Sequence, residues 1–383
     1  MNSRCVHIIL DPGFLDLLLP HVQNATSLSV ISFFTLEEPV QALPDFPKSM
    51  PNLRSLTLHI PEQAEWSPLN DSFDFSTHML RVLSLYNIPL FPSILGLKTL
   101  TELTLFDDNS NLHLDTLLDL LEENHSLESA TLGINFAGAS LRREQRKTPI
   151  GNQLRYLSIC CDYAMDIRAL ISSIALRKGA NLKIYYGDHY NDEGDGLTDI
   201  LSGVSLTHLP SLSSPTFMEY RSSPRIIRLL GPGGSFSYES NFSLGIVFRE
   251  FTVLSLDSIR EFRLKYHASV PRELYLTSFP SLEVLAIGTS TCESTLSIVL
   301  PDPASSSLKT LAFLNFHATE DFMAGLTQFA SDRENTTSAS LNRVVILNQS
   351  NKRLPTLASI ERLRKHVPVV EVMEGMEFPK DLL

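Results

Sequence analysis

Cysteine is scarce in this chain, and its four residues are not arranged for metal or disulfide chemistry. Cys5, Cys160, Cys161 and Cys292 lack the paired spacing of zinc sites. They are also too few for the disulfide framework that stabilises small secreted domains. We therefore expect a reducing compartment and predict a cytoplasmic protein, with the nucleus as the alternative. Adjacent Cys160 and Cys161 are then expected to serve packing at the end of a strand.

Long apolar runs and an excess of positive charge are missing as well. No apolar stretch reaches the roughly 18 residues that cross a bilayer, and the run from Val6 to Leu10 is too short for a signal-peptide core. Lys and Arg number 31 against 43 Asp and Glu, which gives a formal net charge of -12. This charge offers no overall attraction for nucleic-acid phosphates or an anionic membrane, so neither is predicted as a partner.

Sequence motifs for catalysis and cofactor binding are also lacking. There is no His-Glu-x-x-His arrangement and no Gly-x-Ser-x-Gly elbow. The loop Gly231 to Ser235 has no Lys-Ser/Thr pair to make it a phosphate-binding loop, and the acidic stretch Asp188 to Asp195 misses the ligand spacing of an EF-hand. We expect no catalytic residue, no cofactor and no metal. The alternative is a hydrolase whose active site is assembled from distant residues.

The sequence does contain a repeated pattern of the form apolar-x-x-apolar-x-apolar. In the N-terminal part it begins at Leu28, Leu53, Leu80, Leu100, Leu127 and Leu154, with steps of 25, 27, 20, 27 and 27 residues. It resumes at Ile259, Leu282, Leu308 and Leu341, with steps of 23, 26 and 33. Turn-forming pairs such as Pro51-Asn52 and Pro280-Ser281 precede several of these runs.

The spacing within each repeat predicts a strand, because the last two apolar positions are two apart and point to one face. A single repeat cannot bury this face, but stacked repeats can. Segments with apolar residues at helical spacing are predicted as helices: Phe14 to Val22, Leu112 to Asn124, Asp166 to Leu176, Glu320 to Ala330 and Ser359 to His366. The predicted fold is a degenerate α/β leucine-rich-repeat-like solenoid, with parallel strands and helical or irregular return segments.

The repeat is interrupted between about residues 187 and 258 by segments rich in Gly, Asp and Ser. Here Arg225 to Leu230 and Phe242 to Phe248 predict strands around the turn Gly231 to Gly234. We interpret residues 1–383 as a single solenoid with an irregular insertion at 187–258. A second domain that begins near residue 259 is the alternative.

The strand face that points away from the shared core is the predicted binding surface. Tyr86, Phe106 and Tyr156 would bring aromatic contacts to it, beside Ser55, Thr57, Glu102, Thr104, Thr131 and Ser158. Farther along the same face, Arg263 and Lys265 predict a basic spot.

An apolar row is also predicted on this face, formed by Val284, Ala286, Ala312, Leu314, Val345 and Leu347. Such a row marks a partner contact or is covered by another segment. We expect the loop Thr336 to Ser340 or the C-terminal helix as that cover.

The series LRSLTL, LRVLSL, LTELTL and LRYLSI, with PSLEVLAI and SLKTLAFLNF, resembles leucine-rich-repeat regions. With ALISSIALRKGANLKIYYG, IIRLLGPGGSFSY, LNRVVILNQS and HVPVVEV, the chain is similar to F-box and leucine-rich-repeat-like proteins of basidiomycete fungi. The resemblance implies a repeat platform that binds substrate proteins, attached to an F-box that docks on a Skp-type adaptor of a cullin ubiquitin ligase. It also implies an Asn ladder, which Asn135 matches, with Asp108, Asp162 and Gln349 as polar substitutes.

No F-box pattern of the Leu-Pro-x-Glu kind is found ahead of Leu28, so the resemblance covers the repeat region alone. Adaptor and cullin are expected as partners if another segment replaces the F-box. The predicted function is therefore a non-enzymatic protein-protein interaction solenoid, one form of which is the substrate-recognition part of an F-box-type receptor. A scaffold or decaying paralogue without a dedicated partner is a further alternative.

Overall fold

The structure is a computed structural model in which two compact units are distinguished. Unit 1 comprises Met1–His189 with Asp199–Leu209, and unit 2 comprises Tyr190–Thr198 with Pro210–Leu383. The described residues are 5–10, 24–32, 51–59, 79–88, 97–136, 153–187, 196–222, 224–240, 253–266, 278–289, 307–316, 318–336, 340–348, 354–374 and 377.

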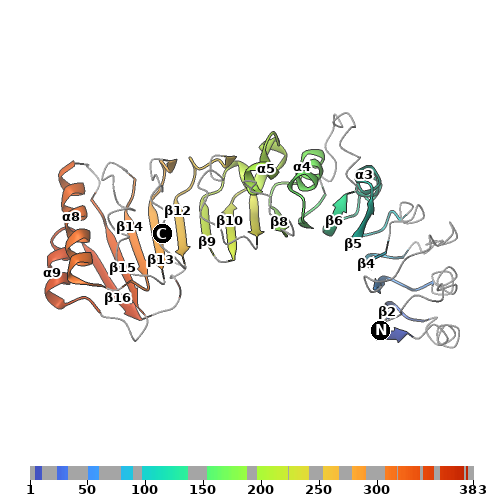
Figure 1. The fold of residues 1–383 in the computed structure, drawn as a ribbon, viewed down its shortest axis with the longest axis horizontal. Helices are drawn as coiled ribbons and strands as arrows, with labels where there is room; N and C mark the ends of the chain where they lie inside the picture. The colour runs from blue at the N-terminus through green and yellow to red at the C-terminus, as the bar shows by residue number, and fades with distance from the viewer. Residues whose placement is uncertain are drawn as a thin grey trace. The chain divides into compact units, whose positions relative to one another are not determined.

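The strands of unit 1 are parallel and follow one another in sequence order (Figure 1). They are β1 (Cys5–Leu10), β2 (Ser27–Ser32), β3 (Ser55–His59), β4 (Val82–Tyr86), β5 (Glu102–Leu112), β6 (Ser129–Phe136), β7 (Tyr156–Cys161) and β8 (Ala180–Tyr186). Each strand from β2 to β7 coincides with one occurrence of the repeat pattern. The predicted α/β architecture with stacked parallel strands is thus confirmed.

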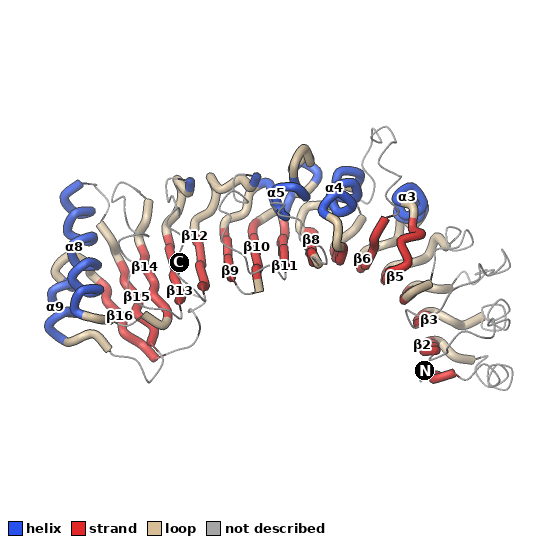
Figure 2. Tube along the Cα trace, viewed as in Figure 1, coloured by secondary structure: helices blue, strands red, loops and turns tan. Residues whose placement is uncertain are grey.

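Helices return the chain between strands of unit 1 and lie on one side of them (Figure 2). The predicted helices appear as α3 (Leu114–Glu123) and α4 (Ala164–Ser173), and the segment Phe14 to Val22 lies outside the described residues. The short helices α5 (Gly196–Leu201) and η3 (Leu206–His208) follow. No helix of the described residues is both long and apolar enough to cross a membrane.

The core of unit 1 is built from the repeated apolar positions. Two side chains from each strand point to the helix side and are almost fully buried, as the pairs Leu83 with Leu85 and Leu157 with Ile159 illustrate. The first apolar position of the repeat is buried just before each strand, for example at Leu53 and Leu80. Stacking therefore removes from water an apolar face that one repeat alone would leave exposed.

A regular backbone contact fixes the stacking at the start of each strand. The carbonyl oxygen of Arg54 accepts hydrogen bonds from the amides of Arg81 and Val82, at 2.7 and 3.0 Å. Equivalent carbonyls at Arg81, Thr101 and Glu128 do the same for the following strand. These carbonyls come directly after the first apolar position of the pattern, which explains why that position marks the strand start so well.

Strand register corrects one prediction, the alignment of the first repeat. Leu28 pairs with Leu56, and Ala25, which is 2 % exposed, occupies the place that Leu53 has in the next repeat. The repeat therefore begins at Ala25, three residues earlier than predicted. An alanine at the first position carries too little apolar character to mark the repeat in the sequence.

Unit 2 begins with an antiparallel segment and continues as a parallel sheet. Its strands are β9 (Phe217–Ser222), β10 (Arg225–Gly231), β11 (Gly234–Ser240), β12 (Glu261–Tyr266), β13 (Val284–Thr289), β14 (Thr310–Leu314), β15 (Arg343–Asn348) and β16 (Val369–Glu374). β10 pairs antiparallel with β9 and β11, whereas β9 pairs parallel with β12. From β12 to β16 all pairs are parallel and in sequence order.

The antiparallel hairpin confirms the predicted strand Arg225 to Leu230 but not its predicted partner. β11 starts directly after the turn, at Gly234, whose φ of 124° is costly for residues other than glycine. The run Phe242 to Phe248, predicted as the second strand, lies outside the described residues.

Helices α6 (Pro210–Ser213), α8 (Glu320–Thr336) and α9 (Leu357–Arg364) complete unit 2. Two of them match the predicted helices 320–330 and 359–366, although α8 is longer at its C-terminal end. Phe322 of α8 packs edge-on against Phe313 of β14, with ring centroids 5.2 Å apart. Because neighbouring strand residues point to opposite faces, α8 covers the sheet face opposite to Ala312 and Leu314.

Candidate partner-binding face

In-register pairing arranges the open face of unit 1 into columns of side chains. We use "open face" for the strand side chains opposite to the helix-side core. The middle column runs from β2 to β7, with one residue from each strand, and every member is a serine or threonine: Ser29, Thr57, Ser84, Thr104, Thr131 and Ser158. Most of these hydroxyls are partly exposed. They present both donors and acceptors and carry no charge.

An aromatic row lies beside the hydroxyl column, toward the C-terminal ends of the strands. The rings of Tyr86 and Phe106 stack with centroids 5.3 Å apart and an interplanar angle of 5°. On the other side of Tyr86, the His59 ring lies at 5.3 Å with a tilt of 52°. The structure thus brings Tyr86 and Phe106 together, as members of one stacked row.

Gly133 on β6 continues this row and provides room for the Phe106 ring. A Cβ atom built at Gly133 would come within 2.5 Å of two carbons of that ring, closer than real contacts allow. The ring therefore lies directly over the Gly133 backbone. Glycine at this position and the aromatic row depend on each other.

Tyr156 lies on the same face but apart from the aromatic row. It belongs to β7 and to the column at the N-terminal ends of the strands, in register with Ser129 and Asn181, and it is 36 % exposed. Tyr86 and Phe106 come from β4 and β5 and the opposite end of the strands. Of the three predicted aromatic residues, two form a cluster and the third does not join it.

The β7 and β8 end of the open face differs in character. Cys160 is half-buried on this face, and the ammonium group of Lys183 lies 4.2 Å from the centroid of the Tyr185 ring. Cys161 points into the core, where burial raises the pKa of its thiol to about 12. It therefore stays protonated at neutral pH, in keeping with a packing role.

A polar contact joins β6 and β7 beneath this end. The Asn135 amide approaches Asp162 at 3.5 Å, which places two residues of the expected Asn ladder next to each other. Asp166, at the start of α4, accepts a 2.8 Å hydrogen bond from the Phe136 amide. Desolvation by burial raises the pKa of this carboxyl, and the hydrogen bond from Phe136 opposes that shift. The side chains of Asp108 and Gln349 lie outside the described residues.

The two basic residues predicted on unit 2 do lie on its strand face, but carboxylates accompany them. Arg263 donates to Glu261, and its guanidinium lies 5.3 Å from the Phe217 ring. The ammonium group of Lys265 is 3.6 Å from Glu219. Arg221 and Arg228 also contact Glu219, which is nearly buried. The expected basic spot is thus a mixed-charge network.

The spacing of opposite charges in the sequence is a signal for these carboxylates. Glu219 stands two residues before Arg221, and Glu261 two residues before Arg263. Residues two apart on a strand share a face, so opposite charges at this spacing predict a pair on that face.

The predicted apolar row of unit 2 is present and almost fully buried. We call it the apolar strip, and its members, each 0 to 4 % exposed, are Val284, Ala286, Ala312, Leu314, Val345 and Leu347. The row therefore belongs to a covered face. Of the two expected covers, α9 does not fit, because it packs on α8 and β16 and not on the strip. Residues 337–339 of the expected covering loop lie outside the described residues.

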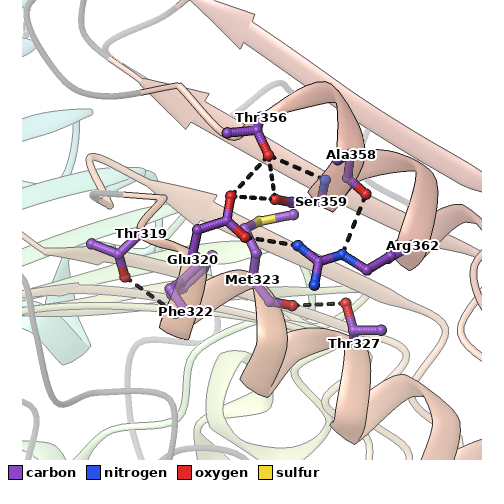
Figure 3. A network of polar contacts seen from close by, with 9 residues as sticks. All are labelled: Thr319, Glu320, Phe322, Met323, Thr327, Thr356, Ala358, Ser359 and Arg362. Carbon is purple, nitrogen blue, oxygen red and sulfur yellow. Dashed lines mark hydrogen bonds and ion pairs between the residues drawn. The ribbon is translucent and has the colours of Figure 1, made fainter.

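A polar network joins the N-terminal ends of α8 and α9 (Figure 3). Glu320 accepts hydrogen bonds from the hydroxyls of Thr356 and Ser359, both at 2.8 Å, and from Arg362 at 2.8 Å. The Thr356 hydroxyl also caps α9 by accepting from the Ser359 amide. Hydrogen bonds from Ser359 and Thr356, with the Arg362 charge, lower the pKa of Glu320. The network fixes the two helices to each other and contains no feature of a binding site.

Groups for metal chemistry do not converge in the part of the chain that the structure describes, where no cluster of three or more His, Cys, Asp or Glu is placed to hold an ion. His366 bonds to Glu334 at 2.9 Å, and His59 packs on Tyr86.

Comparison with known proteins adds no family to this description. No protein-family model matches the chain, and no curated protein matches it.

Proposed function

We propose that this chain is a non-enzymatic protein-binding solenoid and that the open face of unit 1 receives the partner. The observation that carries the proposal is the combination of a continuous hydroxyl column on the six successive strands β2 to β7 with an aromatic row on three of them, β3 to β5. Most residues of both features remain partly exposed, whereas the described apolar residues on the opposite face of the same strands are buried.

The chemistry of this face favours a polypeptide partner of low charge. Serine and threonine hydroxyls can donate to carbonyls and accept from amides, which suits an exposed backbone. The Tyr86 and Phe106 rings supply apolar contact area at low cost in conformational entropy, as aromatic anchors do at protein interfaces. We therefore infer that the partner contributes an extended segment with one or two apolar side chains near the aromatic row.

A finer form of the proposal is that the chain is the substrate-recognition part of an F-box-type ubiquitin ligase receptor. The resemblance of its repeats to F-box and leucine-rich-repeat-like proteins of fungi supports this form, and the repeat-like parallel sheet is compatible with it. Recognition by unit 1 does not depend on ligase coupling, so the two parts are separable by experiment.

The test is affinity purification of the tagged chain from native lysate, followed by mass spectrometry, with wild type beside Tyr86→Ala/Phe106→Ala. We expect a stoichiometric protein that the double variant loses at least tenfold. The matched control is Tyr163→Ala/Met165→Ala, which removes exposed apolar side chains outside the open face and should retain the partner. Equal recovery with both double variants would contradict binding at the aromatic row. Recovery of a Skp-type adaptor and a cullin would support the ligase form, and their absence would reject it.

A further inference from the structure

The antiparallel segment of unit 2 carries exposed side chains on the face opposite to its core. Alternate residues of β10, such as Ile227 and Leu229, are fully buried on the core side. We use "hairpin face" for the side chains of β9, β10 and β11 that point the other way: Phe217, Glu219, Arg221, Ile226, Arg228, Leu230, Ser235, Ser237 and Glu239.

An apolar and a cationic side chain lie next to each other on this face and are both exposed. Leu230 is 46 % exposed although it is large and apolar, and the Arg228 side chain is 45 % exposed. They are two residues apart on β10, so they point to the same side and lie roughly 7 Å apart. Phe217 is in register with Leu230 and extends the apolar contact onto β9.

Positive charge on the hairpin face is only partly neutralised. The nearly buried Glu219 carboxylate is 2.9 Å from the Arg221 guanidinium and 3.4 Å from that of Arg228. Because one carboxylate balances one of these two guanidinium groups, the three residues keep an excess of one positive charge. The Lys265 ammonium group, 3.6 Å from the same carboxylate, adds to this excess.

The surroundings of Arg228 favour a further anion on its β11 side. Glu219 contacts Arg228 from the β9 side, whereas on β11 the residue in register with Arg228 is Ser237, whose hydroxyl can donate to a carboxylate. Glu239 is the other carboxylate of this face. It lies toward the end of the hairpin away from Leu230, in register with Ile226, and among the described residues it forms no ion pair with Arg228.

We propose that the hairpin face binds an extended acidic segment of a partner protein through Arg228 and Leu230. The segment places an apolar side chain on Leu230 and Phe217 and an Asp or Glu side chain on Arg228. Side chains two residues apart in an extended segment point to one side and are roughly 7 Å apart, which matches the spacing of Arg228 and Leu230. The expected motif is therefore an apolar residue and an acidic residue at positions i and i+2.

Charge complementarity is the reason for an acidic partner. A basic segment would be repelled by Arg221 and Arg228, and like charges across an interface suppress the wrong partner. A wholly apolar segment would bury the Arg228 guanidinium without a balancing charge. This site belongs to unit 2 and does not rest on the partner proposed for unit 1.

Selection of short random peptides displayed on phage, with the immobilised full chain as bait, tests the motif. We expect the enriched peptides to share Asp or Glu two positions from an apolar residue. A fluorescently labelled peptide of this kind is then titrated with the full chain, and anisotropy gives its affinity. Because salt screens exposed charges, about 1 M NaCl should weaken the binding severalfold.

Arg228→Glu should weaken this peptide about tenfold or more, since the cation that receives the acidic residue becomes an anion. A peptide with Lys in place of its acidic residue should bind Arg228→Glu better than it binds wild type. The matched control Arg177→Glu makes the same charge change at an exposed loop position of unit 1 and should leave the affinity unchanged. Arg228→Gln adds no second carboxylate beside Glu219, so it serves if Arg228→Glu does not fold, and it should weaken binding severalfold.

Three outcomes would overturn the proposal: no enriched peptide, enriched peptides without an acidic residue, or equal affinity for wild type and Arg228→Gln. Peptides that lose binding to Tyr86→Ala/Phe106→Ala, but not to the Arg228 variants, would occupy unit 1. That result would reject the site on the hairpin face and at the same time support the function proposed for unit 1.

Discussion

The two units use the same strand register for opposite chemistry. In unit 1, the middle column of the open face consists of hydroxyl residues from Ser29 to Ser158, and all of them except the buried Ser158 remain partly exposed. In unit 2, the equivalent column is Arg263, Ala286, Ala312, Val345 and Glu371, of which the three apolar members are buried. Parallel sheets with both faces covered are expected to be apolar on both, and unit 2 follows that rule from β13 to β15.

This difference shows that the stacking pattern does not determine how a repeat face is used. Both units place two apolar residues per strand toward the helix side, which is what the repeat requires. The residue between them is not needed for stacking and is free to be hydroxyl or alanine. In unit 1 that freedom gives a polar face suited to a partner, and in unit 2 it gives a second core.

The largest effect is expected when charge is placed in the middle column. Ala312→Asp puts a carboxylate into a buried apolar strip and should cost about 3 kcal/mol or more in the free energy of unfolding. Thr104→Asp, at the equivalent column of unit 1, should cost less than about 1 kcal/mol because its site is partly exposed. Urea unfolding of both variants measures the contrast.

Milder exchanges between the units keep this comparison informative if Ala312→Asp does not fold. Ala312→Thr introduces the residue type of unit 1 and should cost about 1 to 3 kcal/mol, because its hydroxyl loses water. The reciprocal Thr104→Ala should change stability by less than about 0.5 kcal/mol. Equal costs for the two exchanges would mean that the strip is not the second core described above.

The buried carboxyl of unit 1 is expected to give a smaller, pH-dependent effect. Because burial raises the pKa of Asp166 in the folded state, the folded chain holds this proton more tightly than the unfolded chain. Its contribution to stability is full below the unfolded pKa of about 3.9 and is lost as the pH rises through the folded pKa. Asp166→Asn, which still offers an oxygen to the Phe136 amide, should remove this loss.

Unfolding free energies between pH 3 and pH 7 check this expectation, with Asp199→Asn on α5 as the exposed control. The curve of Asp166→Asn should be flatter than that of wild type on the acid side. Parallel curves would show that the carboxyl is not desolvated, and the hydrogen bond from Phe136 would then be its main interaction.

Much of the fold could be predicted from the sequence, because the apolar residues that the strands bury in the core recur at regular intervals along the chain. The strands at Leu53, Leu80, Leu100, Leu127 and Leu154 and those at Ile259, Leu282, Leu308 and Leu341 lie where the pattern placed them. In strands that were not predicted, such as β8 and β16, the repeat pattern is less distinct in the sequence. β8 has Gly179, with a φ of 85°, at the first apolar position, and β16 follows Val367 in a run of valines.

The candidate faces were harder to predict, since a face depends on which side chains meet across strands. The stacking of Tyr86 on Phe106 follows from pairing β4 with β5, but its tightness depends on Gly133, which single-sequence patterns do not reveal. Tyr156 lies apart from Tyr86 and Phe106 because it belongs to a different column of the open face. The sequence prediction grouped the three aromatic residues without distinguishing the columns. Lys265 can contact Glu219 only because β9 pairs with β12. The sequence analysis predicted an irregular insertion at residues 187–258, so it did not predict this strand pairing.

A modest effect is expected from filling the space under the aromatic row of unit 1. Gly133→Ala forces the Phe106 ring away from the backbone and should unstack it from Tyr86, at a cost of about 1 kcal/mol. Tyrosine fluorescence and urea unfolding report the change. In a Phe106→Ala background the same substitution should be neutral or stabilising by about 0.5 kcal/mol, because the ring is gone. If Gly133→Ala costs the same free energy of unfolding in the Phe106→Ala background, the cost does not come from contact with the Phe106 ring.

The smallest effect is expected at Glu320 in unit 2, because this carboxylate is exposed to solvent. Hydrogen bonds from Ser359 and Thr356 lower its pKa in the folded state, so its contribution is present above the unfolded value of about 4.3 and is lost as the pH falls through the folded pKa. Glu320→Gln should therefore reduce the acid sensitivity of unfolding slightly, while the neighbouring Asp321→Asn should not. Because salt screens exposed charges, 1 M NaCl should weaken the Arg362 contribution and leave the two hydroxyl contacts, so a complete loss of the difference in salt would assign it to Arg362 alone.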